Sequence, residues 1–93
     1  MRSIEYSSQF KKDFKREKKS ARCANLESDL KDVLDFLVAD RVLPAAFADH
    51  PLVGDWKDFR DCHVRPDLIL IYRKKGKAVL QLARLGSHSN LNL

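Results

Sequence analysis

Three histidines and one aspartate are the side chains of this sequence best suited to acid–base chemistry. His50 lies in a segment rich in turn-forming residues, His63 near the end of a stretch of alternating polarity, and His88 in a polar C-terminal segment. The ordinary pKa of an imidazole, about 6.5, suits proton transfer near neutral pH. Asp67 ends a predicted turn at 65–67 and would lie across the hairpin tip from His63, where a carboxylate favours the protonated imidazole. If the loop and the C-terminal segment fold over this tip, the four side chains converge.

Other chemistries have less support in the residue spacing. Three histidines with Asp67 could form a zinc site, but no HExxH or CxxC spacing accompanies them. Cys62 adjoins His63, yet neighbouring strand residues point to opposite faces, so we do not expect a nucleophile–base pair. The sequence also has no Walker motif and no dinucleotide-binding fingerprint. We therefore expect neither a metal ion nor an organic cofactor.

The basic residues suggest a substrate that fits the histidines. The chain carries 18 Lys and Arg against 13 Asp and Glu, a net charge of +5, and such residues bind phosphates strongly. RNA brings its own nucleophile, the 2′-hydroxyl, so an enzyme need only move protons and stabilise charge on the phosphorane. Arg84 is the first candidate for phosphate binding, with Arg60 and Arg65 as further candidates. Each arginine taken singly is more typical of a salt bridge or a solvated strand end.

Charge is spread unevenly along the chain. Residues 1–22 hold eight Lys and Arg against three Asp and Glu, residues 23–56 two against seven, and residues 57–93 eight against three. This pattern indicates basic surfaces at both ends and an acidic helix between them. Lys11, Lys12 and Lys15 belong to the densest basic block, which we interpret as a phosphate-contacting surface or, with equal support, a solvated helix face. Charge alone does not separate RNA from DNA or from an acidic protein partner.

The elements that must position these residues follow from polarity and turn signals. Residues 2–6 predict a short strand, and one of the two serines at positions 7 and 8 then caps a helix with Phe10 and Phe14 as its apolar stripe. Asn25 is predicted to cap a second helix, which ends before the proline at position 44. Its apolar face recurs with helical spacing, at Leu26, Leu30, Val33, Leu34 and Leu37.

The second half is predicted to form a loop and a three-stranded meander. Residues 44–57 have no sustained period and contain proline and glycine, so we expect a loop. Strands follow at 59–64, at 68–72, where a continuous apolar run indicates burial on both faces, and at 78–85. The last residues, 86–93, are predicted to be a polar tail. The order β-α-α-β-β-β predicts an α+β fold, a small antiparallel sheet with two N-terminal helices packed on one face.

Length and composition limit the class of protein further. A chain of 93 residues fits a single domain spanning 1–93. No apolar run approaches the ~20 residues of a membrane helix, and the N-terminus lacks the apolar region of a signal peptide. Cys23 and Cys62 do not form a disulfide framework, and we interpret them as reduced thiols. We therefore expect a cytoplasmic protein without a membrane partner.

Several strings together resemble the RelE-superfamily toxins of bacterial toxin–antitoxin pairs, most closely the YafQ-like branch. The resemblance runs essentially end to end, and its middle strings are the specific ones. The strings are Tyr6-Ser7-Ser8-Gln9-Phe10-Lys11-Lys12-Asp13, Asp49-His50-Pro51-Leu52 with Gly54 and Trp56-Lys57, Phe59-Arg60-Asp61-Cys62-His63-Val64 with Pro66-Asp67, Leu68 to Tyr72, and Arg84-Leu85-Gly86-Ser87-His88-Ser89.

The resemblance implies a ribosome-dependent toxin with a curved antiparallel sheet packed by N-terminal helices. Such toxins cleave messenger RNA in the decoding A site of the 30S subunit, without metal, using the 2′-hydroxyl as nucleophile. The family's active-site set corresponds here to His50, His63, Asp67 and His88. On this correspondence, His50 would be the general base and His88 the general acid, or the two roles would be exchanged. Asp67 would orient a histidine or favour its charged form, and His63 would bind the phosphate.

The resemblance also implies a partner and two competing functions. An acidic antitoxin would hold the toxin inactive in a hetero-oligomer and would fold on the basic surface. The related ParE toxins share the fold but bind DNA gyrase, and they lack this histidine set. A degenerate toxin that only binds its antitoxin is a further alternative, favoured by Asn92. At that position the family commonly has a phenylalanine, which a neighbouring leucine could replace in packing but not in base stacking.

Overall fold

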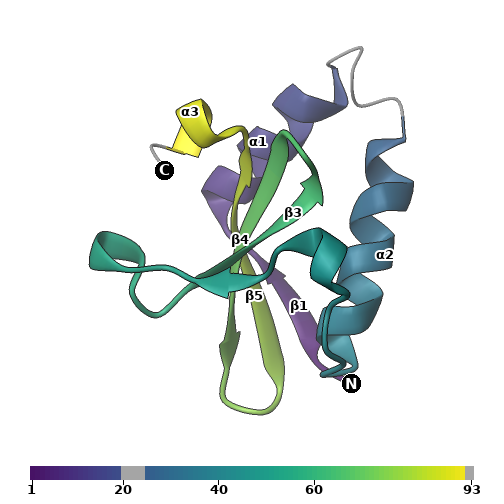
Figure 1. The fold of residues 1–93 in the computed structure, drawn as a ribbon, viewed down its shortest axis with the longest axis vertical. Coiled ribbons are helices and arrows are strands. Elements are labelled where there is room, and N and C mark those ends of the chain that lie inside the picture. The colour runs from purple at the N-terminus through teal and green to yellow at the C-terminus, as the bar shows by residue number, and fades with distance from the viewer. Residues whose placement is uncertain (20–24, 92–93) are drawn as a thin grey trace.

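The fold is an open five-stranded sheet with helices on its faces (Figure 1). A computed structural model describes residues 1–19 and 25–91. Cys23 and Asn92 lie outside these described residues. The elements in chain order are β1 (Ser3–Tyr6), α1 (Ser8–Lys18), α2 (Leu26–Val38), the 3-10 turn η2 (Ala45–Phe47), β2 (His50–Pro51), the 3-10 turn η3 (Gly54–Trp56), β3 (Arg60–Arg65), β4 (Leu68–Lys75), β5 (Val79–Gly86) and α3 (His88–Leu91).

The α+β class is confirmed, but the sheet is mixed and not wholly antiparallel. Its strand order is β1-β5-β4-β3-β2, and β1 runs parallel to β5 while the other pairs are antiparallel. The prediction of an antiparallel sheet was wrong at β1. The pattern of polar and apolar residues can predict that a four-residue strand forms, but not which strand it pairs with or in which direction. The predicted loop at 44–57 contains β2, whose two residues are too few to show a period.

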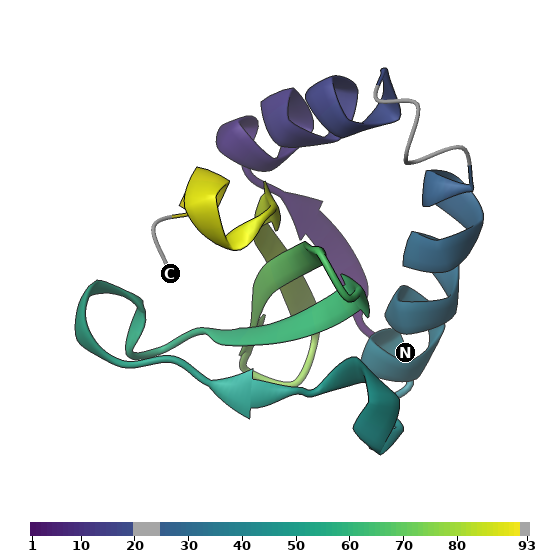
Figure 2. The same ribbon diagram turned by 45° about the horizontal axis from the view of Figure 1, so that its top comes forward.

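The two N-terminal helices cover one face of the sheet, as predicted. Ser7 caps α1 by accepting a hydrogen bond from the Phe10 amide (2.9 Å), whereas Asn25 occupies the cap position of α2 without a side-chain hydrogen bond. Figure 2 shows α1 and α2 curving around the sheet, with α3 lying away from α2. None of the helices in the described part of the chain is long and apolar enough to span a bilayer. The main core lies beneath α1 and α2 and includes Phe10, Leu26, Leu30, Val33, Leu37, Cys62, Leu70, Tyr72, Leu80 and Leu82.

The opposite face carries a second, smaller core. Ile69 and Ile71 of β4 and Ala83 of β5 pack there against Leu91 of α3, with Leu52, Trp56 and Phe59 partly buried around them. The apolar run at 68–72 is buried on both faces, which confirms its prediction. The polar tail predicted at 86–93 was wrong in part, because α3 forms within it. Ser87 caps this short helix through hydrogen bonds with Asn90.

Helix α1 also closes the edge of β5 beyond the end of β1. The Ser7 hydroxyl donates to the Ala83 carbonyl (2.7 Å), and the Leu85 amide donates to the Asp13 carboxylate (3.0 Å). The Arg16 guanidinium donates to the Leu85 carbonyl (3.0 Å). Backbone groups that an unpaired strand edge would leave without partners are thus satisfied by side chains. This closure holds the C-terminal end of β5, from which His88 follows.

Candidate active site

The strand register brings the predicted residues onto one face of the sheet. His50 on β2 lies opposite Asp61 on β3, Asp61 lies opposite Ile71 on β4, and Ile71 lies opposite Arg84 on β5. Residues directly opposite each other on paired strands share a face. Ile71 belongs to the smaller core, so this row lies on the face away from the main core.

A second row brings the other two histidines together. His63 on β3 lies opposite Ile69, which lies opposite Gly86 on β5. The chain then turns into α3, whose first residue is His88 and whose Leu91 packs in the smaller core. The rings of His63 and His88 are 5.6 Å apart between centroids, at an interplanar angle of 60°. We refer to His50, Asp61, His63 and His88 as the histidine cluster.

His50 is an exposed side chain with a defined orientation. Its side chain is 54% exposed, and its Nδ1 atom lies 2.9 Å from the Ala48 carbonyl oxygen and 2.8 Å from Oδ1 of Asp61. A carbonyl oxygen can only accept a hydrogen bond, so Nδ1 carries a proton. The neutral ring therefore has its lone pair on Nε2, the nitrogen that can take up a proton. Ala48 adopts a left-handed backbone conformation (φ 48°) that aims its carbonyl at the imidazole.

Asp61 is a member of the cluster that the sequence analysis did not select. It is 2% exposed, and within the described residues no aligned hydrogen bond reaches its Oδ1 atom. Burial raises the pKa of the Asp61 carboxyl above its ordinary value, while positive charge on His50, His63 and His88 acts to lower it. The signal in the sequence was its position two residues before His63, on the same face of an alternating strand.

His63 lies on β3, two residues before its end, and Asp67 lies within the β3–β4 turn. His63 is partly buried, and its Nδ1 atom lies 3.3 Å from the carbonyl oxygen of Pro66. Asp67 follows this proline and is exposed at the hairpin tip. The turn itself thus contacts the imidazole and places Asp67 at the same end of β3 as His63.

The three candidate arginines are all paired with carboxylates. Arg84 stands in the first row, and its guanidinium donates to Asp13 (2.7 Å). Burial acts to raise the pKa of Asp13, but hydrogen bonds from Arg84, the Leu85 amide and Gln9 outweigh it and hold that pKa below its ordinary value. Arg60 pairs with Asp49 (3.1 Å), and Arg65 pairs with Asp29 on α2, so neither guanidinium is directed at the cluster.

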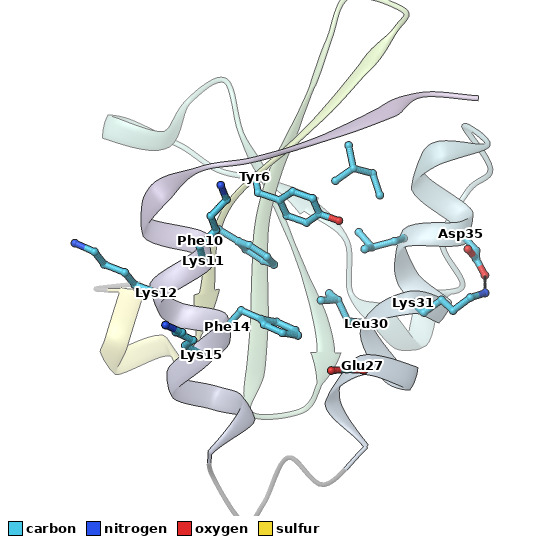
Figure 3. A pocket seen from close by; sticks show the side chains of 12 residues that line it. Tyr6, Phe10, Lys11, Lys12, Phe14, Lys15, Glu27, Leu30, Lys31 and Asp35 are labelled. Carbon is cyan, nitrogen blue, oxygen red and sulfur yellow. Dashed lines mark hydrogen bonds and ion pairs between the residues drawn. The ribbon is translucent and has the colours of Figure 1, made fainter.

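The three candidate lysines are placed elsewhere, on the side that the helices cover. Lys11, Lys12 and Lys15 line an apolar groove of about 770 Å³ between α1 and α2. Figure 3 shows the rings of Tyr6, Phe10 and Phe14 pointing from the α1 side toward α2, with the lysines on the α1 rim and their side chains extending away from these rings. The rest of the lining is Ile4, Glu27, Lys31, Leu34 and Asp35.

The cluster is suited to proton transfer. It offers three imidazoles, one with a fixed tautomer, and a buried carboxylate to balance their charge. Within residues 1–19 and 25–91, no three His, Cys, Asp or Glu side chains are placed to hold a metal ion. Burial raises the pKa of the Cys62 thiol, which disfavours the thiolate that a nucleophile requires.

Comparison with known proteins identifies the relatives of this chain. Residues 2–93 match the family described as YafQ, a bacterial toxin of type II toxin–antitoxin systems. The mRNA interferase toxin YafQ of Escherichia coli K12 is 44% identical over 97% of this chain and 95% of its own. The crystal structure of YafQ from E. coli BL21(DE3) superposes with a TM-score of 0.83, at 39% identity and 98% coverage of both chains. The E. coli DinJ–YafQ toxin–antitoxin complex gives a TM-score of 0.81, at 41% identity and coverage of 97% and 96%.

Proposed function

The chain belongs to the YafQ family of bacterial type II toxins and is an endoribonuclease of the mRNA interferase kind; from this premise we propose that it cuts messenger RNA on the ribosome at the histidine cluster. The observation that carries the proposal is the convergence of three histidines from three separate elements. His50 comes from β2, His63 from β3 and His88 from α3, and the last two rings are 5.6 Å apart. The site of action would be the decoding A site of the small subunit.

The proposed reaction uses the 2′-hydroxyl of the RNA as nucleophile. Nε2 of His50 takes the 2′-hydroxyl proton, the 2′-oxygen bonds to phosphorus, and the bond from phosphorus to the 5′-oxygen breaks. His88 gives its proton to the departing 5′-oxygen, leaving a 2′,3′-cyclic phosphate and a 5′-hydroxyl. His63, beside His88, would hold the phosphate, and Asp67 would favour the protonated state of a histidine at the hairpin tip.

Among the basic residues, Arg84 is the proposed phosphate ligand with the best placement. It shares a row with Asp61, and the buried carboxylate of Asp13 holds its guanidinium. Arg60 and Arg65 would contribute only where RNA phosphate replaces their carboxylate partners. Lys11, Lys12 and Lys15 lie on the helix side, where they would contact ribosomal RNA rather than the scissile phosphate.

Ribosome dependence is tested with a defined messenger RNA, presented free or bound in a ribosome with an open A site. We expect cleavage of the bound RNA at the A-site codon and intact free RNA. The fragments should carry a 2′,3′-cyclic phosphate and a 5′-hydroxyl. Equal cleavage of free RNA would contradict the ribosomal step. Intact RNA together with inhibition of DNA gyrase would instead favour the ParE-like alternative.

The acid and base roles can be separated with an RNA whose 5′-bridging oxygen is replaced by sulfur. A thiolate leaves without protonation, so this substrate does not need a general acid. We expect it to restore cleavage by His88→Ala but not by His50→Ala. Restoration of the His50 variant alone would mean that the two roles are exchanged.

We also propose that an acidic antitoxin docks in the groove between α1 and α2. The groove combines an apolar floor with a lysine rim, which matches an amphipathic segment carrying acidic residues. A relative, YafQ of E. coli, forms a toxin–antitoxin complex with DinJ. Calorimetric titration with the antitoxin encoded beside this chain should show binding that weakens at least tenfold in Lys12→Glu/Lys15→Glu. The matched change Lys77→Glu, at the exposed β4–β5 turn, should leave binding unchanged, and equal binding by both variants would place the antitoxin elsewhere.

A further inference from the structure

We propose that Asp61 is a positioning residue of this site, which sets the tautomer of His50 and balances the charge that the histidines acquire during the reaction. This inference rests on the proposed function for its catalytic consequence, while its structural part stands on the contact between the two side chains. Asp61 itself is buried in the sheet and reaches the reacting atoms only through His50.

Asp61 lies beside Nδ1 of His50, not beside Nε2, the nitrogen proposed to accept the proton. Its Oδ1 atom lies 2.8 Å from Nδ1 of His50, while the Nδ1–H bond is directed at the Ala48 carbonyl. The Ala48 carbonyl accepts the hydrogen bond from Nδ1, and the negative charge of Asp61 beside that atom also favours a proton there, so the lone pair stays on Nε2. Strand β2 consists only of His50 and Pro51, and the pairing of His50 with Asp61 is half of its register. The carboxylate thus orients a side chain that a two-residue strand does not hold by itself.

The burial of Asp61 needs a compensating charge. A carboxylate whose side chain is 3% exposed, with one oxygen that no aligned hydrogen bond reaches among the described residues, is unfavourable unless cations lie near it. The charged groups that act electrostatically on its carboxyl are His50 from β2, His63 from β3, His88 from α3 and, with the opposite sign, Asp49 from the segment before β2. When Nε2 of His50 takes up the proton of the 2′-hydroxyl, the imidazolium forms beside this carboxylate and is stabilised by it.

A structural role alone would predict a different effect of mutation. If Asp61 only supported the fold, Asp61→Asn would lose stability and activity together. If Asp61 is instead a positioning residue whose buried charge costs stability, Asp61→Asn should be at least as stable as the wild type. It should nevertheless cleave RNA more slowly. The amide of asparagine can also donate to Nδ1, which would move the proton of the neutral ring to Nε2 and remove the base.

The first measurement is the tautomer of His50, by nitrogen NMR of the histidine rings in the wild type and in Asp61→Asn. We expect the wild type to carry its proton on Nδ1 at pH above the imidazole titration, and the variant to shift toward Nε2–H. This readout does not depend on activity, so it decides the structural part even if the chain does not cleave messenger RNA on the ribosome. A wild-type His50 protonated on Nε2 overturns the proposal without any variant.

The second measurement is the pH dependence of single-turnover cleavage on ribosomes, with Asp58→Asn as matched control because Asp58 is exposed in the turn before β3. We expect Asp61→Asn to lower the maximal single-turnover rate constant about 100-fold, with the half-saturating concentration unchanged and an altered acidic limb of the pH profile. Asp61→Glu, which keeps the charge, should recover part of the rate. A rate for Asp61→Asn equal to that of the Asp58 control, or a loss matched by unfolding, would overturn the proposal.

Discussion

Each histidine of the cluster is held by a different kind of contact. His50 is oriented by Asp61 and by the carbonyl of Ala48, and His63 by the carbonyl of Pro66 and by the ring of His88. His88 is placed by the start of α3 and carries an exposed ring. The fixed tautomer suits His50 to accept a proton, and the exposed position suits His88 to reach a leaving group.

Asp13 of α1 is a carboxylate whose charge is balanced by ion pairs within the protein. It is fully buried and accepts hydrogen bonds from Arg84, Arg16, Gln9 and the Leu85 amide. Asp13→Asn removes the charge and places an amide donor against these donors. We expect the free energy of unfolding at pH 7, measured by urea titration, to fall by about 3 kcal/mol. The exposed Asp32→Asn on α2 serves as control and should change it by less than about 0.5 kcal/mol.

The same carboxylate makes stability depend on pH in a defined direction. Because its pKa is lowered in the folded state, its contribution is present above the ordinary pKa of 3.8 and is lost as pH falls through the lower, folded value. Urea titrations between pH 7 and pH 2 should therefore show a steeper loss below pH 4 in the wild type than in Asp13→Asn. Parallel curves for the two proteins would mean that Asp13 is not charged in the folded state.

At the scale of elements, short segments decide where the site residues lie. Gly86 ends β5 before α3, and a Cβ atom built there would meet Arg16 Nη2 at 2.9 Å and Asn90 Cβ at 3.1 Å. The side chain of Arg16 can move, but Asn90 belongs to α3. The absence of a side chain at position 86 therefore lets α3 pack closely and sets the place of His88.

Gly86→Ala should displace α3 and with it His88. We expect ribosomal cleavage to fall at least about tenfold, because small misplacements of a catalytic group have large effects on rate. The control is Gly76→Ala at the β4–β5 turn, where φ is +58° and, apart from the neighbouring residues in the chain, no atom of the described residues lies within 4 Å of an added Cβ atom. That change should lower stability by about 1 kcal/mol without slowing cleavage. Equal rates for both variants would show that α3 tolerates the displacement.

Ser7 joins two elements through one hydroxyl, which accepts from the Phe10 amide and donates to the Ala83 carbonyl. Ser7→Ala should therefore lower the free energy of unfolding by about 2 kcal/mol, through the lost helix cap and the unpaired carbonyl. Thermal melts should show no comparable change for Ser8→Ala, since Ser8 is exposed. A similar change in both variants would mean that the edge closure contributes little.

Elements with a long periodic signal were predictable from the sequence, and those set by register were not. The leucine face of α2 and the apolar run of β4 have enough residues to show their periods. By contrast, β2 with two residues and α3 with four are too short to show a period. The parallel pairing of β1 leaves no signal in its own sequence. The histidines drew attention by their chemistry, but Asp61 resembled an ordinary strand residue because only the pairing of β2 with β3 brings His50 to it.

At the scale of the whole molecule, the sheet separates two surfaces for which we propose different functions. One face bears the histidine cluster, and the helices on the other face form the groove with its lysine rim. RNA chemistry and antitoxin binding would then use opposite sides. On this proposal, an antitoxin in the groove would inhibit by covering the lysines proposed to contact the ribosome, without blocking the cluster itself.

Charge at this scale should control association with the ribosome. With a net charge of +5, binding should weaken as salt rises, because phosphate contacts release counterions. Lys12→Gln should reduce the slope of log affinity against log salt by about 1, as measured by filter binding to ribosomes. The control Lys77→Gln should leave the slope unchanged. An unaltered slope for Lys12→Gln would exclude a phosphate contact at that lysine.

Messenger-RNA cleavage on translating ribosomes, mapped to the nucleotide, tests most directly whether the histidine cluster performs the chemistry. It compares the wild type with His88→Ala and with Ser89→Ala, the adjacent exposed residue of α3. The wild type and Ser89→Ala should cut within the A-site codon, and a folded His88→Ala should be slower by about 100-fold or more. Cleavage by His88→Ala at the wild-type rate would contradict the account.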